Sequence, residues 1–190
     1  MTDDSETDWG ALADKWRPHA GYWSWEAERP IEERDVVRTL AETLASDGRA
    51  FFNNARHRGA GNDPPDCEAD GLDGGLIGIE ATEFVDGASI ASARRGEAPP
   101  WKFWTTDKLA PLLEAIIQRK DSKLLRAKGG PYSVHVLVIY TDEAFDLELV
   151  SEHVFQPTST INRVFLLMSY MPSVQGCPCV ELRLGEGSVR

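Results

Sequence analysis

Two carboxylates in one short segment have the spacing and surroundings of a metal site. Residues 62–85, "NDPPDCEADGLDGGLIGIEATEFV", place Asp66 directly after two prolines and Glu80 inside a hydrophobic run. A buried carboxylate is unfavourable unless it is paired or bound to a metal. A divalent cation also relieves the repulsion between two carboxylates, and Mg²⁺ uses one or two of them together with waters and substrate phosphate. We therefore predict a Mg²⁺ or Mn²⁺ site formed by Asp66, Glu80 and the carbonyl oxygen of Ala81.

A β-hairpin is expected to bring the two carboxylates together. Residues 76–84 have the composition of a strand, and "DGLDGG" predicts a turn back to a short strand near residues 67–69. Chain reversal at this turn returns Asp66 towards Glu80. Alternate residues of a strand share a face, so Glu80 lies on the face of Gly78 and not on that of the isoleucines. We expect Gly78 to leave open space for a pocket beside Glu80.

A long helical pattern over residues 105–130 supplies two candidate lysines. Lys120 falls within the apolar stripe of this helix, Lys123 lies at its edge, and Gly129 is the expected end of the helix. An ammonium directed at the carboxylates could orient an attacking water and stabilise developing phosphate charge. The simpler alternative for Lys120 is a lysine whose stem packs while its amine reaches solvent.

The carboxylates also have simpler alternatives. Asp66 could cap the turn that follows two prolines. Glu80 could be an exposed glutamate on an edge strand. In that case the chain would be an unrelated α/β protein without a site at this position.

The hairpin segment resembles the PD-(D/E)xK nuclease superfamily, which has the restriction-endonuclease-like fold. The resemblance rests on "PD" ending at Asp66, a turn, and a hydrophobic strand with "IGIEAT" around Glu80, and it covers about residues 30–145. It implies a metal-dependent nuclease that hydrolyses phosphodiester bonds, with nucleic acid, and DNA in particular, as the substrate. Asp66 and Glu80 would be its catalytic metal ligands.

The third residue of the family motif differs in this chain. Thr82 stands where the family has its lysine. In some branches of the superfamily the lysine comes from a following helix, and the resemblance then implies Lys120 in that catalytic role, with Lys123 as its substitute. An acidic residue of the first helix, such as Glu33, joins some of these sites, although nothing in the sequence selects it over its neighbours.

The order of the expected elements indicates an α/β fold of the mixed α+β kind, with a central mixed β-sheet flanked by helices. The resemblance narrows this fold to the restriction-endonuclease-like type. The remaining predicted elements are helices over residues 29–49 and 143–154, and strands over residues 50–56, 132–142, 163–171 and 179–184.

The 190 residues suit one domain with an arm. Residues 1–30 form an acidic arm that contains Trp9, Trp16, Trp23 and Trp25, and residues 31–190 form the single nuclease-like domain. Tryptophans in a polar segment indicate packing onto the body of the protein, onto a partner protein, or onto a second copy in a homodimer.

The overall charge argues against a surface that is basic throughout. Twenty Lys and Arg residues stand against 31 Asp and Glu residues, which gives a net charge of −11. Nucleic-acid binding depends on phosphate neutralisation and would therefore need a local basic patch. The clustered positive charges lie at residues 55–59, 93–95 and 119–128.

The charge, the tryptophan-rich arm and Thr82 favour an alternative function. In it, the chain is a catalytically inactive nuclease-fold protein that acts as a protein-interaction module. No apolar run approaches the length of a membrane helix, and the acidic N-terminus differs from a secretion signal. We therefore expect a cytoplasmic protein without a membrane partner. Three cysteines do not form a disulfide framework.

Overall fold

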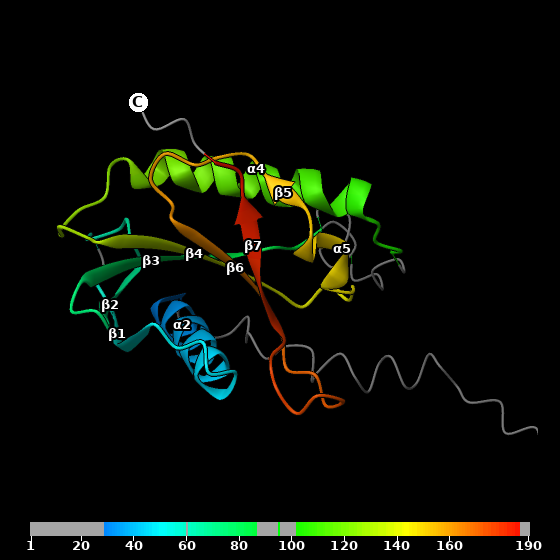
Figure 1. Ribbon diagram of the computed structural model, residues 1–190, viewed down its shortest axis with the longest axis horizontal. Coiled ribbons are helices and arrows are strands. Elements are labelled where there is room, and N and C mark those ends of the chain that lie inside the picture. The colour runs from blue at the N-terminus through cyan, green and yellow to red at the C-terminus, as the bar shows by residue number, and fades with distance from the viewer. Residues whose placement is uncertain (1–28, 60, 87–94, 96–101, 187–190) are drawn as a thin grey trace, which may run out of the picture.

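A mixed β-sheet organises the part of the chain that the computed structural model describes, which is residues 29–59, 61–86, 95 and 102–186. Within these residues the sheet has seven strands in the order β1-β2-β3-β4-β6-β7-β5. Helix α4 covers one face and helix α2 the other (Figure 1). This arrangement confirms the predicted α/β class with a mixed sheet between helices.

The elements have the following bounds. The strands are β1 (Phe52–His57), β2 (Cys67–Gly71), β3 (Leu76–Glu83), β4 (Val134–Thr141), β5 (Val154–Phe155), β6 (Arg163–Met168) and β7 (Cys179–Leu184). The helices are α2 (Arg29–Ser46), α4 (Thr106–Leu124) and α5 (Glu148–Ser151).

Antiparallel strands flank a parallel centre on both sides. β1, β2 and β3 pair antiparallel, β3, β4 and β6 pair parallel, and β7 returns antiparallel to β6. Parallel neighbours need a crossover, and α4 provides it between β3 and β4. The connectivity therefore sets α4 directly over the strand that carries Glu80.

The two faces of the sheet bury separate hydrophobic clusters. Ile77 and Ile79 of β3 pack with the apolar stripe of α2, whereas Leu137 and Ile139 of β4 pack with α4. Glu80 pairs with Leu137 in the parallel register and therefore lies on the α4 side. The predicted separation of Glu80 from the isoleucine face is confirmed.

Two predicted elements were wrong in extent. The helix expected over residues 143–154 is reduced to α5: residues 143–146 have no regular structure, and Val154–Phe155 pairs with β7, with Phe155 buried in the α4-side core. α4 ends at Leu124, before Gly129, whose φ of 79° belongs to the turn that leads to β4.

The expected arm is largely outside the described residues: residues 1–28 are not described, and α2 begins at Arg29. The same holds for most of the segment between β3 and α4. Among the helices that are described, none combines the length and the hydrophobicity that a bilayer crossing requires.

Asp121 fastens the end of α4 to the loop before β6. Its carboxylate is 6% exposed and accepts the backbone N–H groups of Ser159, Thr160 and Ile161 at 2.8–2.9 Å. We expect Asp121→Ala to lower the free energy of unfolding by about 3 kcal/mol, because buried donors lose a charged acceptor. Urea denaturation measures this, with exposed Ser122→Ala as the control; equal effects of the two substitutions would contradict this role.

Candidate metal centre

Asp66 is placed at the centre by the end of the β2–β3 ladder. The last pair of this ladder joins Cys67 to Ile79, and Pro65 beyond it has no N–H to continue the pairing. The next free N–H of β3, that of Ala81, instead donates to Asp66 Oδ2 at 2.9 Å. Asp66 is only 5% exposed and is held beside β3, as the hairpin predicted.

The expectation of open space beside Gly78 is wrong. A Cβ at Gly78 would lie 3.1–3.2 Å from atoms of Pro65, Tyr132 and His135. A side chain at this position would crowd these three residues, which pack directly against the backbone of β3. The close packing brings Pro65 onto the strand and thereby fixes Asp66 next to it.

Glu80 is fully buried, and its two oxygens have different surroundings. Oε1 accepts Lys120 Nζ at 2.6 Å and Lys123 Nζ at 2.8 Å. Oε2 is buried and has no hydrogen-bond partner among the described residues. An orphaned buried carboxylate oxygen is costly, and a cation is the kind of partner that removes this cost.

The helical stripe explains how Lys120 reaches Glu80. The buried residues of α4 recur at helical spacing, and Lys120 is one of them at 8% exposure. Its ammonium also lies 3.5 Å from the Ala81 carbonyl oxygen, so that carbonyl faces the same centre. Two of the simple alternatives were wrong: Lys120 does not reach into solvent, and Glu80 is not an exposed residue of an edge strand, because β3 lies between β2 and β4.

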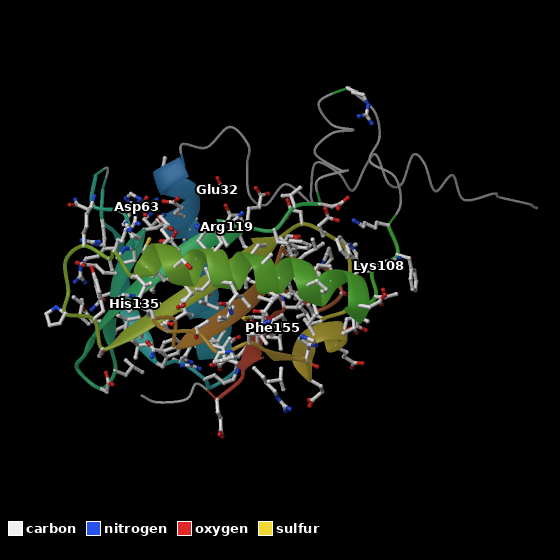
Figure 2. The ribbon with its side chains drawn as sticks, turned by 90° about the horizontal axis from the view of Figure 1, so that it is seen from above. Glu32, Asp63, Lys108, Arg119, His135 and Phe155 are labelled. Atoms are coloured by element: carbon white, nitrogen blue, oxygen red, sulfur yellow. The ribbon has the colours of Figure 1, made fainter. Side chains whose placement is uncertain are left out.

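Asp63 completes an acidic triad that the sequence analysis missed. Ligand oxygens of Asp63, Asp66 and Glu80 all lie within 4.8 Å of one another. Lys123 bridges two of them, because its Nζ is 2.7 Å from Asp63 Oδ1 and 2.8 Å from Glu80. Figure 2 shows Asp63 beside the C-terminal end of α4. Its position three residues before Asp66, in the same proline-containing loop, was the available signal.

The electrostatics of the triad favour a bound cation. Burial, followed by the nearby charge of Glu80, raises the pKa of the Asp66 carboxyl to about 7. Partial burial opposes charge on Lys123, but its hydrogen bonds to Asp63 and Glu80 raise the pKa of its ammonium to about 12. Lys123 therefore stays charged, whereas Asp66 gains a proton readily until a cation offsets the crowded negative charge.

Glu33 of α2 approaches the centre from the other side of the sheet. It is 6% exposed, and its Oε2 lies 3.2 Å from His57 Nε2. The Gly59 N–H donates to His57 Nδ1 at 2.9 Å, so the other ring nitrogen, Nε2, is the one that faces Glu33. The charge of Glu33 is one of the causes that raise the pKa of Asp66, which places this first-helix acid near the triad.

The donor set suits a hard divalent cation. Three carboxylates and one carbonyl offer only oxygen ligands, the preference of Mg²⁺ and Mn²⁺. No thiol joins the triad, since burial raises the pKa of Cys67 to about 12 and keeps its thiol protonated. The residues present therefore fit the predicted cation, with the unpartnered oxygen of Glu80 as the direct structural reason.

Comparison of the chain with protein-family models, with curated proteins and with solved structures returns no match.

The two lysines should contribute unequally to stability. The Lys120 side chain is 10% exposed and that of Lys123 is 34% exposed, so solvent screens the second more strongly. We expect Lys120→Met to lower the free energy of unfolding by about 3 kcal/mol, and Lys123→Met by less than about 1 kcal/mol. Urea denaturation of both variants measures these losses. In a Glu80→Gln background the difference between the two variants should shrink. Equal losses of stability in the two single variants would contradict the unequal contributions.

Metal affinity should depend on pH through Asp66. A cation binds the ionised carboxylate, so protons compete with it below the pKa of about 7. Mn²⁺ affinity measured by calorimetry is expected to rise about tenfold per pH unit up to about pH 7 and to level off above it. Asp142→Asn is the matched control, because burial raises the pKa of that carboxyl to about 6 outside the triad. An affinity that does not change with pH would contradict the role of Asp66.

Proposed function

We propose that this protein is a metal-dependent nuclease that hydrolyses phosphodiester bonds, with DNA as the expected substrate. The observation that carries the proposal is the buried Glu80 carboxylate, which lies within 4.8 Å of two further carboxylates. Two lysines contact one of its oxygens, and the other has no partner in the part of the chain that the structure describes. The choice of nucleic acid follows the resemblance to the PD-(D/E)xK superfamily, and DNA is its expected form.

The residues have distinct roles in this proposal. Asp66, Glu80 and Asp63, with the Ala81 carbonyl, hold the cation. When bound, Mg²⁺ or Mn²⁺ supplies Lewis acidity towards a phosphate oxygen and a water molecule. The Lys120 ammonium, 2.6 Å from Glu80 Oε1, orients the attacking water and stabilises the negative charge that develops on the phosphate.

The proton and bond changes follow from hydrolysis. The oxygen of water forms a bond to phosphorus, and the bond from phosphorus to one sugar oxygen breaks. The proton lost by the water passes to solvent, and the leaving oxygen takes up a proton. Lys123 can act as the substitute for Lys120, because both ammonium groups reach the same oxygen of Glu80.

A catalytically inactive nuclease-fold module remains the second candidate. The specific observation in its favour is that two ammonium groups already contact Glu80 Oε1, so the carboxylate has partial compensation without a metal. Thr82 at the place of the family lysine and the net charge of −11 point the same way. Calorimetry with Mn²⁺ separates the two candidates. A metal site gives a heat of binding that Glu80→Gln abolishes, whereas an inactive site gives no such heat.

Cleavage assays with the full chain test the nuclease proposal. We expect Mn²⁺- or Mg²⁺-dependent cleavage of DNA, and at least a 100-fold loss in Glu80→Gln, because an amide is a far weaker ligand than a carboxylate (a loss of about this size is typical of disrupted metal sites). Glu148→Gln, an exposed glutamate on α5, is the matched control and should retain full activity.

Two results would reject the nuclease assignment. One is full cleavage by the Glu80→Gln variant. The other is cleavage that persists after chelation of divalent cations. Circular dichroism of Glu80→Gln establishes that a loss of activity does not come from a loss of folding.

A further inference from the structure

A groove lies beside the second half of α4, the helix that carries Lys120. It has a volume of about 290 Å³ and lies between the chain just after β3 and one edge of α4. Phe84 and Val85 form its sheet side, and Leu112, Ala115 and Ile116 form its helix side. Ile116 is one helical turn before Lys120, so the groove leads directly to the lysine end of the metal centre.

One basic side chain of α4 lines this groove. Arg119 lines it, is exposed, and makes no ion pair within the described part of the chain. Figure 2 shows Arg119 along the same edge of α4 as Asp63. An arginine that makes no ion pair with a carboxylate can form two parallel hydrogen bonds to a phosphate.

The acidic residues of the groove do not oppose a phosphate near Arg119. Alternation along β3 turns the Glu83 side chain to the α2 face, the face of Ile79 and Ala81, so its backbone lines the groove. Asp86 forms an ion pair with Lys102, which stacks on Trp104 at 4.3 Å. The exposed charge at the helix side is therefore positive.

We infer that this groove binds one unpaired nucleotide next to the scissile phosphate, with its sugar and base against the apolar wall and its phosphate on Arg119. This inference rests on the proposed nuclease function and names its substrate class as single-stranded nucleic acid. The volume suits one nucleotide, and a base that lies against the groove wall cannot at the same time be paired within a duplex. Five of the eight lining residues are apolar and three are charged, and small-ligand sites likewise combine apolar side chains with a few placed polar groups.

Two variants test the groove by different means. Arg119→Gln removes the phosphate contact, and Ala115→Leu fills the groove with a residue that favours helix. The matched control is Arg126→Gln, an exposed arginine beyond the end of α4 and outside the groove. Circular dichroism establishes that all three variants are folded.

The readout compares an oligothymidylate with bis(p-nitrophenyl) phosphate, which has no flanking nucleotide. We expect Arg119→Gln and Ala115→Leu each to lower the ratio of kcat/KM for the oligonucleotide to kcat/KM for the small ester about tenfold, mainly through KM. Arg126→Gln should leave the ratio unchanged. A blunt duplex should be cleaved more slowly than the single strand.

The outcomes separate this inference from the nuclease proposal. An unchanged ratio in both groove variants, or faster cleavage of the duplex, overturns the groove assignment while the metal site stands. If the wild-type chain cleaves neither substrate, the nuclease proposal fails, and anisotropy of a labelled oligothymidylate then decides the groove. Weaker binding by Arg119→Gln than by Arg126→Gln supports the groove, and equal binding or none overturns it.

Discussion

A negative charge in the interior of the sheet is the constraint around which the other features are arranged. Glu80 has no exposed surface, and a lone carboxylate there would be strongly unfavourable. Two lysines of one helix approach a single oxygen of this carboxylate, from 40 and 43 residues along the chain. The crossover helix α4 therefore contacts Glu80 through its two lysines, and the loop of Asp63 joins the same group through Lys123.

The topology makes this arrangement possible. β3 and β4 are parallel, so the chain must leave the end of one and return to the start of the other over a face of the sheet. α4 makes this passage on the face to which Glu80 points. The short pairing between β2 and β3 leaves the second half of β3 uncovered on its other edge, and there the loop of Asp63 and Asp66 enters.

The parts of this arrangement with a local signal were predictable. Period-two alternation placed Glu80 opposite the isoleucines, and helical spacing placed Lys120 towards the sheet. The type and order of most helices and strands, and hence the α/β class, followed from the same patterns. The helix predicted over residues 143–154 was wrong in extent: it is limited to α5, and its last residue instead pairs with β7.

The parts that depend on distant contacts were not predictable. The sequence gives no sign that Pro65, Tyr132 and His135 converge on Gly78, since they come from three separate segments. Asp63 was missed because its meeting with Lys123 spans 60 residues and depends on the course of an irregular loop. Side-chain partners of this kind are set by tertiary packing, which no local period records.

The hydrogen bond from the Ala81 N–H to Asp66 has a consequence for the way a cation would be held. It holds Oδ2 against the backbone of β3, so the carboxylate that would hold the cation is already oriented. The same bond locks the rotamer of the side chain before any ion arrives. The side chain of Asp66 therefore loses its conformational entropy on folding, and this loss does not weaken the later binding of the ion.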